Sequence, residues 1–319
     1  MIKHLSLLFT LVNIFAYSTA INKIDFDVSL GKNDPYFGRY YARCMSILNN
    51  AESPWTYLGT TPEPISPLVT LCRTLYFRNP LPTTLRTTTQ PKIPLKVHQI
   101  WLGSPFPEKY KAWQKTWQSM PDFTYKLWTD ADVEKMDFDV KDIYLKSKNY
   151  GQRSDILRMV ILEREGGMYI DTDFECIEPE FFKLLHCTYD FYTGLHPLDA
   201  ETFALENALI GSIAHHPIVK AYLKQLKDKW QKPSLNAYDE VVVKTGPGLF
   251  TRAFSQEAGK KYKDIALPPT FFYPLGLQQW DFLKRFSYET IKKKVLKPES
   301  AAIHWWHGTW KAPQSKVFK

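Results

Sequence analysis

The chain has 319 residues, of which 44% are hydrophobic and 23% charged, and its formal net charge is +8. This apolar content is enough for an ordinary buried core and excludes an intrinsically disordered chain. The positive charge could favour an anionic nucleotide or an acidic membrane surface, but basic clusters such as 292–294 are short. No nucleic-acid-binding signature accompanies them, so no nucleic-acid partner is expected.

The first twenty residues resemble a targeting segment. Lys3 precedes an apolar run from Leu5 to Tyr17, and small residues follow just before Ile21. This order predicts a signal peptide over residues 1–20. A signal anchor is the alternative, although the run is shorter than the roughly 20 apolar residues of a spanning helix. Both interpretations predict export, either to the secretory or Golgi lumen, with type II anchoring as one form, or out of the cell. Any membrane association would occur through this N-terminus.

Residues 21–92 are irregular and rich in proline and threonine, most of all in the segment 80–89. They predict a small N-terminal stem or cap followed by a linker, with one plausible helix from Tyr36 to Asn49. A single larger domain is expected over residues 93–315. The four cysteines allow one or two disulfides or four buried thiols, and none has the spacing of zinc ligands.

Strands and helices then alternate along the chain. Leu95 to Leu102 predicts a buried strand, Glu108 to Gln118 a helix with aromatic residues on one face, and Phe123 to Trp128 a second strand. Thr129 or Asp130 can cap a short helix that begins at the next residue. This alternation favours an α/β fold with a mainly parallel sheet.

The clearest element is a helix from Gln152 to Glu165, for which Ser154 is the expected N-cap. Gly166 and Gly167 can end it in a left-handed turn. A short strand, 168–170, then leads directly into Asp171-Thr172-Asp173. Ligands of open α/β sheets bind beyond the carboxyl ends of strands, where this path delivers both aspartates.

Two carboxylates separated by one residue at the end of an apolar strand predict a divalent cation, because near a core their charges need a positive partner. Oxygen ligands favour magnesium, manganese or calcium, and such a metal can bridge a diphosphate. Asp173 lies further into the loop and is the better direct ligand, whereas Asp171 could act through water or bind a ribose. A solvated turn is the alternative interpretation of the triplet.

A second pair of charged residues lies on the preceding helix. Asp155 and Arg158 are three residues apart and can face the same site as a fixed acceptor and donor, suited to sugar hydroxyls. An ordinary salt bridge within the helix is the alternative.

These motifs resemble a known family. The segments 154–158 and 166–173 are similar to the DXD-containing glycosyltransferases related to fungal initiating α-1,6-mannosyltransferases and inositol-phosphoceramide mannosyl synthases. The catalytic domains of clostridial glucosylating toxins share the pattern. Further matching blocks follow in the expected order, at 97–103, 123–128, 245–247, 271–274 and 301–310. The resemblance thus spans roughly residues 93 to 310.

The resemblance implies a GT-A fold, a Rossmann-like α/β sandwich, and a role for each matching residue. Trp101 would contact the nucleotide base, Asp155 and Arg158 the donor sugar, and Asp171 and Asp173 the ribose, diphosphate and metal. The remaining roles are metal or phosphate contact for His304, closure over the donor for Trp310, and an acceptor-side contact for Asn207. Core packing, or a buried hydrogen-bonded amide in the case of Asn207, is the alternative for the uncharged residues. His307 receives no role.

The resulting hypothesis is a retaining glycosyltransferase, dependent on Mn²⁺ or Mg²⁺, that moves a hexosyl group from a GDP- or UDP-sugar to a glycan, lipid or protein hydroxyl. A catalytically silent sugar-nucleotide or glycan-binding protein of the same fold is the alternative. A hydrolase is disfavoured, because the paired aspartates lie too close together on one loop for an inverting acid and base.

Overall fold

The computed structural model describes residues 24–49, 65–80, 90–147, 149–200, 203–231 and 241–308. The expected signal peptide, the proline- and threonine-rich residues 81–89 and Trp310 lie outside this range. Within it, no helix has the length and hydropathy needed to cross a membrane.

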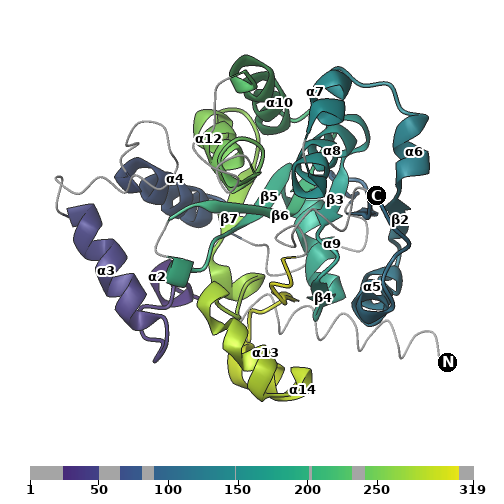
Figure 1. Cartoon of the computed structure of the whole chain (residues 1–319). Coiled ribbons are helices and arrows are strands. Elements are labelled where there is room, and N and C mark those ends of the chain that lie inside the picture. The colour runs from purple at the N-terminus through teal and green to yellow at the C-terminus, as the bar shows by residue number, and fades with distance from the viewer. Residues whose placement is uncertain are drawn as a thin grey trace.

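The strands and helices form an α/β structure (Figure 1). The strands are β1 (Lys96–Ile100), β2 (Thr124–Trp128), β3 (Gly167–Ile170), β4 (Phe174–Cys176), β5 (Phe191–Leu195), β6 (Leu205–Ser212), β7 (Asp264–Leu267) and β8 (Ala302–His304). The helices before β3 are α2 (Phe26–Ser29), α3 (Gly38–Asn49), α4 (Ile65–Arg78), α5 (Lys111–Gln118), α6 (Asp130–Glu134), α7 (Lys141–Lys146) and α8 (Tyr150–Glu165). Those after it are α9 (Pro179–Thr188), α10 (Pro217–Lys229), α12 (Pro247–Glu257), α13 (Phe282–Arg285) and α14 (Tyr288–Val295).

The central sheet has six strands in the order β2-β1-β3-β6-β5-β7. The pairs β1–β2, β1–β3 and β5–β7 are parallel, whereas β6 runs antiparallel to both its neighbours. A separate antiparallel ribbon joins β4 to β8. The predicted α/β class with a mainly parallel central sheet is confirmed.

Each face of the sheet has its own hydrophobic core. Helix α8 packs on β1 and β3, next to α7 and α10, and α12 packs on β6 on the same side. Helix α9 and the β4–β8 ribbon contribute to the core of the opposite face. Side chains of β3 alternate between the two cores, with Tyr169 toward α8 and Met168 and Ile170 toward α9. Asp171, the next residue, therefore continues on the α8 side.

The turn between α8 and β3 has the predicted glycines. Gly166 and Gly167 have φ values of 60° and 97°, a region in which glycine avoids the steric cost of a Cβ. A Cβ on Gly167 would also lie 2.9 Å from the carbonyl oxygen of Lys96 on β1. The two glycines thus let helix α8 end tightly against the sheet and enter β3 directly.

The expected N-cap of α8 is wrong. The helix begins at Tyr150, and the side chain of Asn149 accepts a hydrogen bond from the backbone N–H of Gln152. Ser154 lies one turn inside the helix, where its hydroxyl contacts the Tyr169 hydroxyl at 3.2 Å. The apolar stripe begins only at Ile156, so the polar first turn, which contains Gly151, was not recognised as helical.

The described part of residues 24–80 is a cap packed on the α/β body. The predicted helix in this region is confirmed as α3. Helix α4, in a segment that the sequence indicated to be irregular, packs against β7. The amide of Asn79 at its end donates to the carbonyl of Asp264 at 2.9 Å. A domain boundary at residue 92 stays a prediction. All four cysteines are buried thiols, and none of them forms a disulfide.

Candidate functional site

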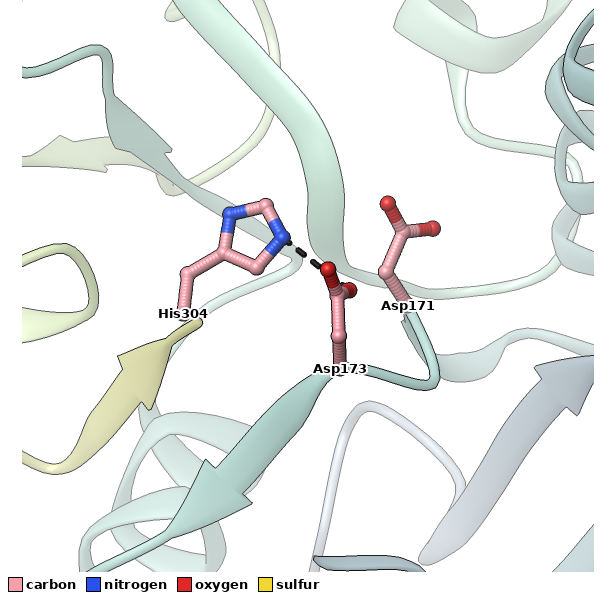
Figure 2. Close-up of side chains that lie close together, drawn as sticks. All are labelled: Asp171, Asp173 and His304. Atoms are coloured by element: carbon pink, nitrogen blue, oxygen red, sulfur yellow. Dashed lines mark hydrogen bonds and ion pairs between the residues drawn. The ribbon is translucent and has the colours of Figure 1, made fainter. Parts of the chain in front are cut away.

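Three side chains meet beyond the carboxyl end of β3 (Figure 2). Asp171 follows β3, Asp173 precedes β4, and His304 is the last residue of β8, which pairs with β4 so that Phe174 lies opposite His304. His304 Nε2 lies 3.1 Å from Asp173 Oδ1. One possible ligand atom from each residue lies within 4.8 Å of the others, a grouping that no other histidine, cysteine or acidic residues form in the described part of the chain.

Asp173 is held in its ionised form. Its Oδ2 accepts a hydrogen bond from the backbone N–H of His307 at 2.8 Å. Burial would raise the pKa of Asp173, but the charge and hydrogen bond of His304 outweigh this and lower the pKa to about 2. The carboxylate is therefore available as an anionic ligand at neutral pH.

The three residues fit a divalent cation. Carboxylate oxygens suit magnesium and manganese, and an imidazole nitrogen is compatible with manganese and the later transition metals. The His304 ring is fixed by stacking on Phe174, with ring centroids 4.4 Å apart. Asp171 keeps a side-chain exposure of 29%, so this side of the cluster is open to solvent. The cation would be held by Asp171, Asp173 and His304.

Arg158 of α8 is buried behind Asp171. Its guanidinium Nη1 donates to the carbonyl of Asn207 at 2.7 Å and lies 3.3 Å from Asp171 Oδ1. Its Nη2 lies 3.1 Å from Asp155 Oδ1. The arginine side chain is only 5% exposed, and a buried guanidinium requires such partners. Arg158 thus links the helix to the first aspartate of the triplet.

Asp155 is the centre of a second set of buried bonds. The amide of Asn207 donates to its Oδ1 at 2.8 Å, and the hydroxyl of Thr245 donates to its Oδ2 at 2.9 Å. Burial raises the pKa of Asp155 to about 6 even though these partners and Arg158 oppose the shift. Both oxygens of Asp155 already have protein partners, so its role in the structure is to stabilise the buried guanidinium of Arg158. A contact of Asp155 with a donor sugar stays a prediction.

The structure places the other predicted residues at varying distances from the cluster. Trp101 follows β1 at the same edge of the sheet, half-buried, and its indole N–H donates to Ser104 Oγ at 3.0 Å. The Asn207 amide is committed to Asp155, so its acceptor-side role stays a prediction with a competing structural explanation. Trp310 lies outside the described residues. His307 contributes its backbone N–H to Asp173, while its ring packs on Trp113.

Three further residues complete the site and were not singled out for it from the sequence. Tyr169 donates its hydroxyl to Asp171 Oδ1 at 2.6 Å, and Gln99 donates its amide to the Asp171 carbonyl at 3.2 Å. Thr245 lies in the matching block 245–247, but it had no expected role in the site. Tyr169 and Gln99 lie in apolar strands, where the pattern indicates core packing. A polar hydroxyl or amide within an apolar strand was the only sequence feature that could have indicated their roles in the site.

The fold and site define an α/β protein with two carboxylates and a histidine, able to hold a metal ion, at the carboxyl edge of its sheet. Residues 107–186 match the family described as the glycosyltransferase sugar-binding region containing a DXD motif. This matched region includes Asp155, Arg158, Asp171 and Asp173.

Named relatives agree with this match. The chain is 30% identical over 192 residues to inositol phosphoceramide mannosyltransferase 2 of Schizosaccharomyces pombe, covering 57% of this chain and 51% of that protein. It is 30% identical over 245 residues to Subversion of eukaryotic traffic protein A of Legionella pneumophila, covering 67% and 34%. The chain therefore spans about half, or less, of the length of these relatives.

Among solved structures, the PaToxG glycosyltransferase aligns with 61% of this chain and 78% of its own, at 21% identity and a TM-score of 0.43.

Proposed function

We propose that this protein is a metal-dependent, retaining glycosyltransferase of the GT-A type, which moves a hexosyl group from a nucleotide sugar to a hydroxyl acceptor. The observation that carries the proposal is the convergence of Asp171, Asp173 and His304 at the end of β3, with the buried Arg158 3.3 Å behind Asp171. The match of residues 107–186 to the DXD family supports the same chemistry.

The chemistry requires charge stabilisation of a departing nucleoside diphosphate. A bound Mn²⁺ or Mg²⁺ would neutralise charge on the diphosphate and act as a Lewis acid. Arg158 adds a fixed positive charge on the α8 side of Asp171, and its buried partners prevent it from reorganising. The backbone N–H of His307 holds Asp173 in one orientation. We place the nucleotide base beside Trp101.

Retention of configuration forms part of the proposal. The acceptor hydroxyl would attack the anomeric carbon from the face that the diphosphate leaves. Nuclear magnetic resonance of the first product would report the anomer, and a product inverted relative to the donor would contradict this mechanism.

The donor and acceptor are proposed by class. GDP- and UDP-hexoses are the expected donors, and glycan, lipid and protein hydroxyls the expected acceptors. The Schizosaccharomyces pombe relative is named an inositol phosphoceramide mannosyltransferase. A mannosyl donor and a lipid headgroup acceptor are therefore the first substrates that we propose to test. We also propose an exported protein, acting in a secretory lumen or outside the cell.

The test is a panel of UDP- and GDP-sugars with Mn²⁺, in which nucleoside diphosphate release is measured for the full chain, Asp173→Asn and Asp139→Asn. Asp139 is a matched control, because its side chain is 83% exposed. We expect one donor to be consumed in a metal-dependent reaction that is lost in Asp173→Asn and retained in the control. Metal-dependent donor binding by folded protein with no release from any donor would instead favour the silent binding protein.

A further inference from the structure

A second buried pair of charged side chains lies beside the metal centre. His196 follows β5 and Glu206 is the second residue of β6, and His196 Nε2 lies 2.7 Å from Glu206 Oε1. Their side chains are 12% and 8% exposed. Neither residue belongs to the sequence motifs that predicted the site.

Among the described residues, only one oxygen of the Glu206 carboxylate has a hydrogen-bond donor. His196 Nδ1 lies 3.0 Å from the carbonyl of Pro197, so both ring nitrogens face acceptors and both carry protons. Burial opposes this charge, but Glu206 outweighs it and the pKa of His196 is raised. Glu206 Oε1 is thereby occupied, whereas Oε2 accepts no hydrogen bond from any residue that the structure describes.

The position of Glu206 follows from the strands. The backbone N–H of Asp171 donates to the carbonyl of Ala208 at 2.9 Å. Strand β6, which lies next to β3 (Figure 1), therefore continues beside Asp171. Leu205 packs in the core on the α8 side and Asn207 donates to Asp155 of α8, so Glu206 between them points to the opposite face, which it shares with Ala208. Ala208 belongs to the core formed with the β4–β8 ribbon, which carries His304. Glu206 is therefore on the His304 side of the sheet.

Trp306 connects the two groups. Its ring centroid lies 5.9 Å from that of His196 and 4.1 Å from that of His304. The Trp306 indole is fixed, because its N–H donates to the carbonyl of Leu275 at 2.8 Å. One aromatic ring thus separates His196, the partner of Glu206, from His304.

A purely structural role explains this arrangement poorly. A buried ion pair loses hydration energy, which its attraction recovers only when the remaining lone pairs are also satisfied. Asp155, on the opposite face, has protein donors on both oxygens. Among the described residues, Glu206 has a donor on Oε1 but none on Oε2. Oε2 therefore has the property expected of a group that accepts a hydrogen bond from a bound hydroxyl.

We propose that Glu206 binds the acceptor, accepting through Oε2 the hydrogen bond of the hydroxyl that attacks the donor sugar, and that His196 is a positioning residue for this carboxylate. This inference rests on the proposed function and adds the acceptor side of the same site. The ligand class is a neutral hydroxyl, either an alcohol or water, because an anionic acceptor atom would be repelled by the carboxylate.

The reaction balances without another reagent. The bond between the anomeric carbon and the acceptor oxygen forms as the bond to the diphosphate oxygen breaks, and the electron pair of that bond leaves with the diphosphate. The hydroxyl proton, which lies in the hydrogen bond to Glu206 Oε2, moves to this carboxylate as the new bond forms and is then released to water. His196 keeps its protons and fixes Glu206 Oε1.

The test uses water as the acceptor, so no natural acceptor is needed. Nucleoside diphosphate release from the donor that the wild type consumes is measured with Mn²⁺ for Glu206→Gln, His196→Gln and the control Glu163→Gln. Glu163 forms a similar pair with His215 at 2.9 Å, in which the His215 side chain is 64% exposed. We expect Glu206→Gln to lower kcat by about 100-fold with an unchanged donor KM, as misplacement of an attacking group does. His196→Gln should show a smaller fall in kcat, and Glu163→Gln none.

Binding of the nucleoside diphosphate with Mn²⁺, measured by calorimetry, shows whether each variant keeps a folded donor site. Wild-type kcat in Glu206→Gln, or a raised donor KM with unchanged kcat, would overturn the inference while leaving the proposed function intact. Glycosylated wild-type protein in intact-mass spectra, absent in Glu206→Gln, would make Glu206 a nucleophile and also overturn the orienting role. A wild type that consumes no donor would remove the proposed function and this inference together.

Discussion

At the scale of single residues, the site depends on buried charges that have several partners each. Arg158 contacts both Asp155 and Asp171, and Asp155 in turn accepts from Asn207 and Thr245. Each bond supplies part of the compensation that a charge needs when it leaves water. The orientation of Asp171 is thus set by residues that need not touch a ligand.

Thr245→Val tests this dependence. The change keeps the shape of the side chain but leaves Asp155 Oδ2 without its donor, so we expect the free energy of unfolding to fall by about 1–3 kcal/mol. Thr245→Ser, which keeps the hydroxyl, is the matched control. Urea unfolding of the three proteins measures the effect, and equal stability of Thr245→Val and wild type would contradict it.

The residues of the site were predictable to different degrees. Asp171, Asp173 and the Asp155 and Arg158 pair lie in one continuous segment, so periodicity and a strand end were enough to bring them together. His304 came only from the family resemblance, because its contact with Asp173 depends on the pairing of β4 with β8, 130 residues apart in the chain. Glu206 was missed, since one acidic residue in an apolar strand gives no signal of which face it occupies.

At the scale of elements, the path from α8 through Gly166 and Gly167 into β3 delivers the aspartates. This unit was predictable, because the apolar stripe, the glycines and the short strand are consecutive. Helix α4 was not. Its neighbours in sequence are rich in proline and threonine. Its apolar side chains indicate a helix face only once they pack against β7, a strand nearly 200 residues away.

Two substitutions on α4 test whether it is part of the core or a detachable stem. Leu75 is 1% exposed, so Leu75→Ala should lower the free energy of unfolding by about 2–5 kcal/mol. Phe77 is 59% exposed on the same helix, and Phe77→Ala should stay within about 0.5 kcal/mol of wild type. Denaturant unfolding followed by tryptophan fluorescence gives both values. A near-neutral Leu75→Ala would show that α4 is not docked.

At the scale of the whole molecule, neutral histidines join the sheet to its surroundings. His98 Nε2 contacts the carbonyl of Gly166 at 3.0 Å, and His186 lies between the carbonyl of Ile93 and the Tyr192 hydroxyl. Burial lowers the pKa of His98 to about 4 and that of His186 to about 3. The contacts with Gly166 and Ile93 connect segments that are distant in the chain, and burial keeps both rings uncharged at neutral pH.

These shifts predict how stability changes with pH. The unfolded chain takes up protons at these histidines near pH 6.5 and the folded chain does not. The stability they contribute is therefore complete above pH 6.5 and is lost as the pH falls toward 4 and 3. The slope should approach about 1.4 kcal/mol per pH unit for each histidine. Urea unfolding at pH 7 and pH 5 should show a smaller loss in His186→Gln than in wild type, and an equal loss would contradict this explanation.

The most direct test of the central claim is the position of the metal. Crystals grown with Mn²⁺ and either UDP or GDP would be measured at a wavelength where manganese scatters anomalously. We predict an anomalous peak bounded by Asp171, Asp173 and His304, with the diphosphate density beside it. Density for the nucleotide without manganese at these three side chains, or manganese bound elsewhere, would contradict the account.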